Sequence, residues 1–330
     1  MINRDEQRED FISASGYSNW NFAPLTADAS ARQYYRGTSG QSSLILMDAP
    51  PKHGENIEPF LDVTKRLHGF DLKAPEILVY DIVTGFILME DFGDNLVATH
   101  CKNHPQDEDS IYRSAIDVLA VLKSQSNRCD LAPYDRDVYH QEAALVLDWY
   151  CAPLTTSARR AFFDGLDAAL GHLSPHPPVL TLRDYHAENL IWRSDMSGTD
   201  RLGLLDYQDA LAGHPAYDLV SLIEDARRPI AKGLHEKLVQ YAAKCLIIPV
   251  ESLRQDVAIL GAQRNLKIIG IFARLFKRDG KAKYPPMIPH VFDLLQTDLA
   301  HPTCKDLQSW CARHLPTPNE DRISAILGTK

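Results

Sequence analysis

LRDYHAENLIW (Leu182–Trp192) places three polar side chains at short fixed intervals between two apolar runs. The polar side chains are those of Asp184, His186 and Asn189, and the apolar runs are VLTL before them and LIW after them. Apolar runs on both sides of a polar segment predict two extended stretches joined by a loop. The loop therefore carries a carboxylate, an imidazole and a carboxamide close together along the chain.

A further apolar segment, LGLLD, ends in Asp206 and follows the turn-rich stretch RSDMSGTDR. Together with LIW, this segment predicts a hairpin. Because the two open ends of a hairpin lie side by side, Asn189 and Asp206 should come together, with Asp184 just outside them. Three oxygen-bearing side chains then converge on one small volume.

This set of side chains suits phosphoryl transfer from a magnesium nucleotide, in which the protein mainly positions groups and neutralises charge. Mg²⁺ prefers oxygen ligands, and Asn189 and Asp206 supply them. Asp184, which is not committed to the metal, can accept the proton of an attacking hydroxyl. His186 either takes part in the reaction or orients the loop backbone. The competing interpretation is structural, because aspartate and asparagine also cap turns and helices.

The rest of the chain predicts a small sheet followed by a mainly helical region. After a first helix ending near Gly16, we expect a hairpin in QYYRGTSGQSSLILMDAP, a helix in IEPFLDVTKRLHGF and strands in EILVYD and GFILMED. From Asp107 onwards, Ile111 and later apolar residues recur at helical spacing.

Charge and cysteine usage exclude several classes of protein. The formal charge of −9 and the pI near 5.8 argue against a nucleic-acid partner, which would require a basic face. The N-terminal stretch MINRDEQRED lacks the apolar core of a signal peptide, and no run approaches a membrane span, so we expect a cytoplasmic protein with no membrane partner. The six cysteines are scattered without CxxC spacing, which indicates neither a zinc site nor a disulfide framework.

DYHAENLIW followed by LLDYQDA resembles the catalytic loop and the metal-binding strand of the aminoglycoside phosphotransferase and choline kinase superfamily. Within that superfamily, ADASARQYYR, LILMDAPP, GFILMEDFGD, HPAYDLVSLIEDARR and QRNLKIIGIFARLFKRDGKAKY resemble bacterial anomeric sugar kinases that act on N-acetylmuramate and N-acetylglucosamine. The resemblance spans nearly the whole chain in the expected order. It implies an α+β, protein-kinase-like fold with two lobes: a nucleotide-binding lobe of residues 1–92, with a sheet and one helix, and a larger, mainly helical catalytic and substrate-binding lobe of residues 93–330.

The resemblance also implies roles for individual residues. Asp184 would be the catalytic base, and Asn189 and Asp206 would hold the Mg²⁺ of a bound ATP. Asp209, just beyond, either supports the metal ligands or caps a helix. The DFG triplet of Asp91–Gly93 precedes the catalytic loop instead of following it, so we assign no metal to it. The segment formed by Glu90, Asp91 and Phe92 is instead expected to be the hinge between the lobes, whose backbone would bind adenine.

Two positions depart from the kinase pattern. Leu182 stands where many kinase-like proteins have a histidine, and Met47 stands where a phosphate-pairing lysine is expected. Arg32 and Arg36 are the nearest cationic replacements, because a guanidinium binds phosphate well. The alternative is that both arginines lie on an exposed hairpin and do not bind phosphate. The chain has no G-x-x-x-x-G-K-[ST] motif, so a P-loop enzyme is not supported.

Four charged residues after the metal-binding strand, where the superfamily builds its substrate pocket, are expected to contact the acceptor: Asp225, Arg227, Arg228 and Arg264. Charges of both signs suit a sugar with hydroxyls and a carboxylate better than a polycationic aminoglycoside. For each residue alone, a surface salt bridge is the alternative.

The sequence therefore predicts an ATP-dependent kinase acting on a small-molecule hydroxyl, most specifically the anomeric hydroxyl of an amino sugar. An aminoglycoside or amino-alcohol kinase is the alternative within the class. A nucleotide-binding pseudokinase with a regulatory role is the alternative from another class, since Met47 and Leu182 depart from the kinase pattern.

Overall fold

The first part of the chain forms a five-stranded antiparallel sheet in the computed structural model, which describes residues 3–25 and 32–327. The strand order is β1-β2-β3-β5-β4. The strands are β1 (Asn21–Pro24), β2 (Gln33–Ser39), β3 (Ser42–Asp48), β4 (Ile77–Asp81) and β5 (Phe86–Glu90). The predicted hairpin and the two later strands are therefore confirmed, whereas the short β1 was missed.

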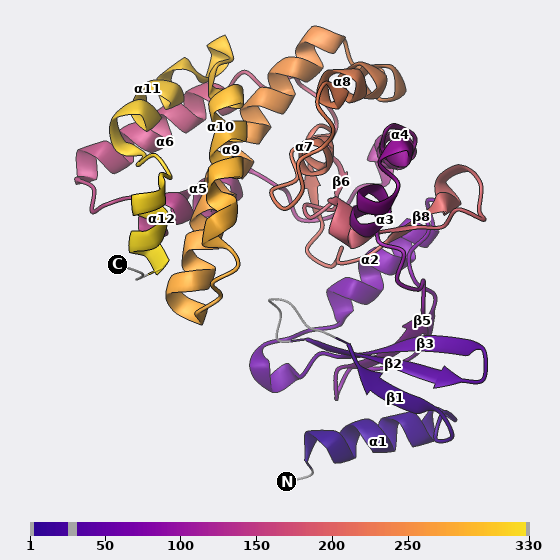
Figure 1. The fold of residues 1–330 in the computed structure, drawn as a ribbon. Coiled ribbons are helices and arrows are strands. Elements are labelled where there is room, and N and C mark those ends of the chain that lie inside the picture. Colours follow the sequence, from indigo (N-terminus) through magenta and orange to yellow (C-terminus); the bar gives the residue numbers. More distant parts are fainter. Residues whose placement is uncertain (1–2, 26–31, 328–330) are drawn as a thin grey trace. The chain divides into compact units, whose positions relative to one another are not determined.

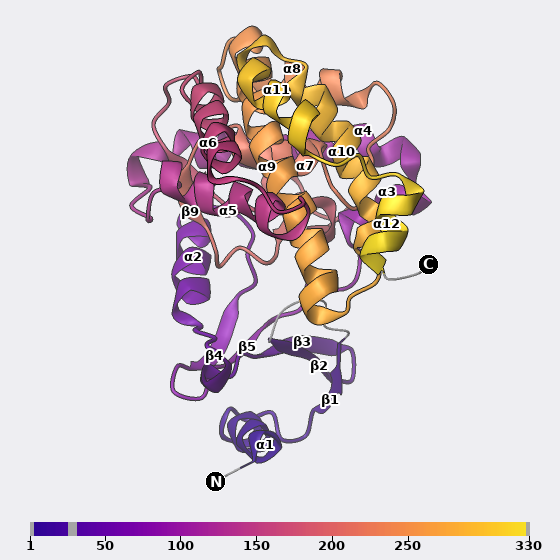
Figure 2. The same cartoon turned by 90° about the vertical axis from the view of Figure 1, so that its left-hand side faces the viewer.

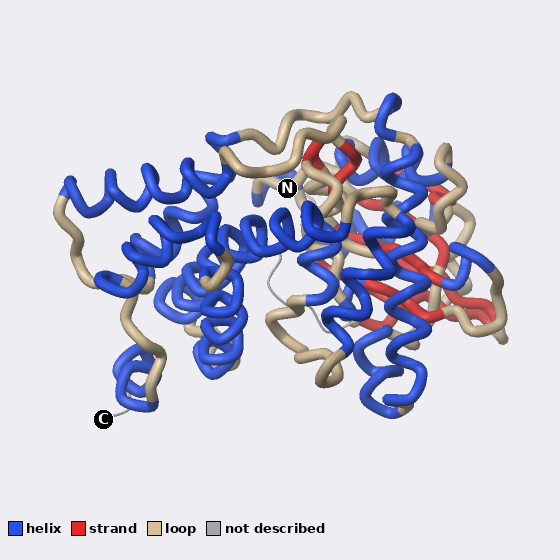
Figure 3. The backbone as a smooth tube through the Cα atoms, turned by 90° about the horizontal axis from the view of Figure 1, so that it is seen from above, coloured by secondary structure: helices blue, strands red, loops and turns tan. Residues whose placement is uncertain are grey.

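Contacts between residues divide the chain into two units, which are described separately below. Unit 1 consists of Met1–His100 and Glu188–Asp209, and unit 2 consists of Cys101–Ala187 and Ala210–Lys330. Figure 3 shows that the long strands gather in unit 1, whereas helices make up most of unit 2. The functional division at residue 92 stays a prediction.

Two helices accompany the sheet in unit 1. Helix α1 (Arg4–Ala14) lies along the sheet (Figure 1), and its Phe11 stacks on Phe86 with ring centroids 5.3 Å apart. Helix α2 (Glu58–His68) follows the short 3₁₀ turn η1 (Pro51–His53). The predicted helix is confirmed, and its buried face consists of Phe60, Val63, Thr64 and Leu67.

A second hairpin belongs to unit 1 although it lies far along the sequence. Strands β7 (Leu190–Trp192) and β8 (Leu202–Leu204) pair antiparallel, as predicted, with η4 (Ala187–Asn189) before β7 and η5 (Gly198–Arg201) between them. Asn95 fixes this hairpin to the segment after β5: its carbonyl accepts the Trp192 N–H at 2.8 Å and its Nδ2 donates to the Trp192 carbonyl at 2.8 Å. Tyr207, just beyond β8, stacks on Phe60 of α2.

Unit 2 is built around one long helix, α9 (Val250–Asp279), which α5 and α10 accompany (Figure 2). Gly270 permits the close approach of α5, because a Cβ at this position would lie 2.3 Å from the Leu145 carbonyl carbon. None of the helices in the described residues combines the length and apolar character that a membrane span requires.

The remaining helices are α3 (Val97–Asn103), which runs across the boundary between the units in the sequence, and α4 (Glu108–Ser124), α5 (Arg136–Trp149), α6 (Thr156–Leu170), α7 (Tyr217–Ile223), α8 (Leu234–Cys245), α10 (Ile288–Leu299), α11 (Lys305–His314) and α12 (Glu320–Leu327). Four 3₁₀ turns connect them: η2 (Pro105–Asp107), η3 (Ser126–Arg128), η6 (Pro285–Met287) and η7 (Pro302–Cys304). The predicted helix after Asp107 is confirmed, since the expected apolar residues of α4 are buried.

Unit 2 also contains a two-stranded ladder that the sequence analysis did not anticipate. Strand β6 (Val179–Thr181) pairs antiparallel with β9 (Leu211–Gly213), and Thr181 lies opposite Leu211. The chain leaves β6 directly into the loop of residues 182–189. The ladder therefore fixes the point from which this loop starts.

Candidate active site

Asn189 and Asp206 come together in unit 1 because β7 and β8 pair. The Leu205 N–H donates to the Asn189 carbonyl at 3.0 Å, and the Asn189 Nδ2 lies 3.4 Å from the Asp206 Oδ2. Asp206 has a φ of +57°, a backbone angle that residues other than glycine rarely adopt. Strain of this kind gathers at functional sites. The pair offers oxygen donors at one point, which is the chemistry that Mg²⁺ prefers.

In unit 2, the backbone that precedes Asp184 is held by a buried carboxylate that the sequence analysis missed. Asp218 of α7 accepts the N–H groups of Leu182 at 2.6 Å and Arg183 at 2.8 Å, and Arg183 has φ of +71°. Burial raises the pKa of Asp218 to about 7; the two N–H groups oppose this shift and the charge of Asp184 adds to it. An aspartate inside the apolar run AYDLVSLI was the available signal.

Asp184 is half-buried in a cationic environment. Burial favours a higher pKa for this carboxyl, but positive charge, led by that of Lys267 and including Arg264 and Arg183, outweighs burial and lowers the pKa. Asp184 is therefore a carboxylate at neutral pH. A carboxylate is the form that can accept a proton.

Glu142 organises two of these cations. Its Oε1 accepts the Lys267 Nζ at 2.8 Å and also binds the Arg183 guanidinium, while its Oε2 accepts the Tyr134 hydroxyl. Burial opposes ionisation of Glu142, but Lys267 and Arg183 lower its pKa. The buried network holds both cations in place, and neither Glu142 nor Lys267 was singled out from the sequence.

His186 is buried and neutral, because burial, with the charge of Arg227, lowers its pKa to about 4. Its Nε2 accepts from the Arg227 Nη1 at 2.8 Å. Asp225 accepts the N–H groups of Arg227 at 2.9 Å and Ala187 at 3.4 Å. These contacts favour the interpretation that His186 orients the loop. They also give Asp225 and Arg227 a part in supporting it.

The two remaining predicted acceptor contacts differ in their environments. Arg228 lies in an ion pair with Glu108 at 2.5 Å and donates to the Tyr112 hydroxyl at 3.0 Å, which makes it part of the packing. Arg264 is buried, and its Nη2 donates to Ser221 Oγ at 2.8 Å, while its Nη1 has no hydrogen-bond partner among the described residues. Arg264 is therefore the better candidate for binding an acceptor.

The two arginines of the β2 region also have different environments within unit 1. Arg36 lies between two carboxylates, with Nε 2.7 Å from Asp91 Oδ2 and Nη1 2.7 Å from Asp94 Oδ2. Arg32 pairs with Glu55 at 2.7 Å. Residues 27–31 of the ADASARQYYR motif lie outside the described residues, and Met47 on β3 is fully buried.

The chemical surroundings of Arg32 and Arg36 favour different roles. Burial favours a lower pKa for Arg32, but Tyr34, Glu55 and, with the smallest contribution, Asp209 raise it. Asp91 and Asp94 already balance Arg36 with two negative charges. Arg32 is therefore the better candidate for an incoming phosphate.

The predicted hinge, Glu90 to Phe92, lies at the end of β5. Arg193 lies over the Phe92 ring at 5.0 Å, and a Cβ on Gly203 would approach that ring to 2.6 Å, so the close contact depends on glycine. A polar cavity of about 370 Å³ is lined by Glu90, Asp91, Phe92, Asn95, Trp192, Arg193, Ser194 and Asp195. All of these residues belong to unit 1.

Comparison with known proteins shows to which family this chain belongs. The sequence profile of the phosphotransferase enzyme family matches residues 21–247. The chain belongs to this family. It is accordingly a small-molecule kinase, as predicted.

Two proteins similar to this phosphotransferase are named N-acetylmuramate/N-acetylglucosamine kinases. The Caulobacter vibrioides protein is 30% identical, and the match covers 95% of this chain and 97% of the relative. The Pseudomonas aeruginosa protein is 33% identical, over 84% of this chain and 83% of the relative. The predicted family resemblance is thereby confirmed.

The fold of the phosphotransferase matches solved kinases at low sequence identity. The choline kinase LicA of Streptococcus pneumoniae superposes with a TM-score of 0.63 and 14% identity, covering 92% of this chain and 99% of LicA. This likeness, which shows the fold alone, confirms the predicted α+β, protein-kinase-like class.

Proposed function

We propose that this phosphotransferase transfers the γ-phosphoryl group of ATP to the anomeric hydroxyl of an amino sugar of the N-acetylmuramate or N-acetylglucosamine type. The observation that carries this proposal is the similarity to kinases named for these sugars along 95% of the chain. Family membership alone would equally allow other small-molecule hydroxyls.

In the proposed reaction, the sugar hydroxyl oxygen attacks the γ-phosphorus and the bond from that phosphorus to the β,γ-bridging oxygen breaks, which releases ADP. The hydroxyl proton passes to Asp184. Its surroundings support this role, because Lys267 and Arg264 keep the carboxyl ionised at neutral pH. General-base catalysis contributes typically about 10²- to 10⁴-fold to the rate.

The proposed metal is Mg²⁺, held by Asn189 and Asp206. Their side chains lie 3.4 Å apart and offer oxygen donors, which fits the preference of Mg²⁺ for oxygen. The ion would supply charge neutralisation for the phosphates. Gln208 supports the pair by donating to Asp206 Oδ1 at 2.9 Å.

We assign the role of the missing phosphate-pairing lysine to Arg32, whose side chain is held by Glu55. Arg36 would act differently from the sequence-based expectation, by tying β2 to the hinge through Asp91 and Asp94. This tie would keep the end of β5 in place for binding of adenine by the backbone of Glu90 to Phe92.

The acceptor is proposed to bind in unit 2 near Arg264, whose Nη1 retains a donor for a sugar hydroxyl or carboxylate. The cationic surroundings of Asp184 disfavour a polycationic aminoglycoside by charge repulsion. An amino alcohol such as choline carries a positive charge and is disfavoured for the same reason.

An acceptor screen tests this proposal. ATP consumption would be measured with N-acetylmuramate, N-acetylglucosamine, an aminoglycoside and choline, each with Mg²⁺ and with no metal. We expect turnover with the amino sugars and dependence on Mg²⁺. Preferential turnover of the aminoglycoside or choline would overturn the substrate assignment while leaving the family intact.

A further inference from the structure

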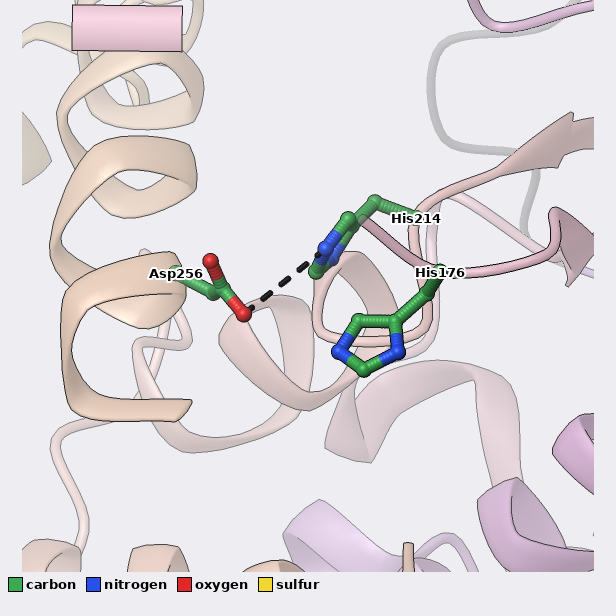
Figure 4. Close-up of side chains that lie close together, drawn as sticks. All are labelled: His176, His214 and Asp256. Atoms are coloured by element: carbon green, nitrogen blue, oxygen red, sulfur yellow. Dashed lines mark ion pairs between the residues drawn. The ribbon is translucent and has the colours of Figure 1, made fainter. Parts of the chain in front are cut away.

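A second polar cluster in unit 2 consists of His176, His214 and Asp256 (Figure 4). His176 lies between α6 and β6, His214 directly follows β9, and Asp256 lies in the second turn of α9. Each residue contributes one nitrogen or oxygen atom, and these atoms all lie within 4.8 Å of one another. The His214 Nε2 and the Asp256 Oδ2 are 3.7 Å apart.

Two atoms of this cluster are buried without a hydrogen-bond partner in residues 3–25 and 32–327. They are the Nε2 of His176 and the Oδ2 of Asp256. Asp256 is fully buried; its Oδ1 accepts the Ser174 N–H at 2.8 Å, and the Ser174 side chain also hydrogen-bonds to this carboxyl. Since buried polar atoms nearly always have a partner, these two atoms indicate a bonding requirement that the neighbouring residues do not meet.

Both histidine rings are neutral, which is the charge state that binds metals. Burial lowers the pKa of His176 and brings that of His214 to about 4, so both rings are neutral at neutral pH. The His214 Nε2 donates to the Ser174 carbonyl at 3.1 Å, and its Nδ1 accepts from Ala216 N–H at 3.2 Å. For a cation to bind at Nε2, the ring proton would move to Nδ1, the hydrogen bond from Ala216 would break, and the Ser174 carbonyl would lie beside the cation.

We propose that His176, His214 and Asp256 bind one transition-metal ion of the Zn²⁺ type. Two imidazoles and one carboxylate are a common donor set for Zn²⁺, whereas Mg²⁺ prefers oxygen alone. A tetrahedral Zn²⁺ holds its ligand atoms about 3.4 Å apart. This spacing is close to the 3.7 Å between His214 and Asp256. Water or the Ser174 carbonyl would supply the fourth ligand.

The place of the cluster gives the ion a structural role. At one end of the β6–β9 ladder, Val179 pairs with Gly213, next to the two histidines. At the other end, the chain leaves β6 into the loop that carries Asp184. The ion would join the histidine end of the ladder to α9 and so stiffen the strand that leads into the loop.

Metal binding to the full-length protein tests the proposal without any measurement of activity. Zn²⁺ alone would be the probe, in equilibrium dialysis with excess Mg²⁺ to occupy oxygen-only sites, and Co²⁺ absorption would report the ligand field. We expect one Zn²⁺ per chain. Asp256→Asn, which keeps the size of the side chain, and His176→Ala should each weaken binding by about tenfold or more.

Two further variants separate this site from adventitious binding. His172→Ala removes an exposed histidine from the segment between α6 and β6, which also carries His176, and should leave Zn²⁺ binding unchanged. Lys123→Met removes a positive charge that acts on both His176 and His214, and it should tighten Zn²⁺ binding. Absence of Zn²⁺ uptake by the wild type, or wild-type affinity in folded Asp256→Asn and His176→Ala, would overturn the proposal.

Discussion

Asp184 and Asp256 lie in the same helical unit, yet their surroundings shift their pKa values in opposite directions. Positive charges led by Lys267 overcome burial and lower the pKa of Asp184. Around Asp256, burial prevails and raises the pKa. Burial alone therefore does not decide the protonation state of a carboxyl. A carboxylate kept ionised by cations suits proton acceptance, whereas one that faces two neutral imidazoles suits cation binding.

The largest effect expected from this comparison is the loss of catalysis in Asp184→Asn. The substitution keeps the size of the side chain but removes the basic carboxylate, so kcat should fall by about 10²- to 10⁴-fold with ATP affinity retained. Steady-state kinetics together with ATP calorimetry would measure both. Asp256→Asn, assayed alongside, should lose far less, since Asp256 is assigned a structural role. Comparable losses in the two variants would remove the distinction between them.

The next largest effect concerns Asp218, which holds the backbone before Asp184. In Asp218→Asn, an NH2 group replaces one of the two carboxylate oxygens and cannot accept the N–H that this oxygen accepts, and the misplaced loop should lower kcat by about 10²-fold. ATP binding by calorimetry should not change. Unchanged kcat in a folded variant would show that the loop does not depend on this support.

Asp218 also makes a prediction about stability against pH. Its pKa is about 7 in the folded protein, against an ordinary 3.8. Its contribution to the free energy of unfolding is therefore full below about pH 4 and is lost as pH rises to 7. The asparagine in Asp218→Asn does not titrate, so this variant should lack the pH-dependent part of the stability that Asp218 contributes. Urea unfolding of both proteins across this range would measure the difference. Parallel pH profiles would contradict the raised pKa.

A smaller effect separates the two arginines of the β2 region. Loss of charge-assisted hydrogen bonds in Arg32→Ala should weaken ATP binding by about tenfold or more. Arg36→Ala should instead lower the melting temperature more than Arg32→Ala, because it leaves Asp91 and Asp94 without their shared cation. Calorimetry and thermal unfolding would be compared. The reverse pattern would return the phosphate role to Arg36.

The smallest effect is on acid stability. The pKa of His214 is about 4 in the folded protein, against an ordinary 6.5. With a chelator present, neutral His214 therefore adds to the free energy of unfolding above pH 6.5, and this addition is lost as pH falls towards 4. His214→Asn should show a weaker loss over this range. The remaining slope should include His186, whose pKa is also about 4. An unchanged slope would indicate that His214 does not titrate in this way.

The sequence predicted those features whose residues are close along the chain. LRDYHAENLIW and LGLLD were enough to predict the hairpin that joins Asn189 to Asp206, because local alternation and turn residues determine a hairpin. The supports of the loop were not predictable in this way. Asp218 and Lys267 reach the loop from helices far along the chain, and only tertiary packing gives them their partners.

The histidine cluster was hidden for the same reason. His176, His214 and Asp256 come from three segments without any metal-binding spacing, and the search for cysteine motifs could not find them. The ion pairs of Arg36 could not be predicted from the sequence either, because its two carboxylate partners, Asp91 and Asp94, follow a different strand. A charged residue in a sequence gives no sign that its charge is already balanced.

Phosphate transfer to N-acetylglucosamine and to its methyl glycoside, followed by phosphorus NMR, tests whether the anomeric hydroxyl is the acceptor. The methyl glycoside keeps the ring and the acetamido group but has no anomeric hydroxyl. We expect a glycosyl 1-phosphate from the free sugar and no transfer to the glycoside. Equal transfer to both, or a phosphate on another hydroxyl of the free sugar, would contradict it.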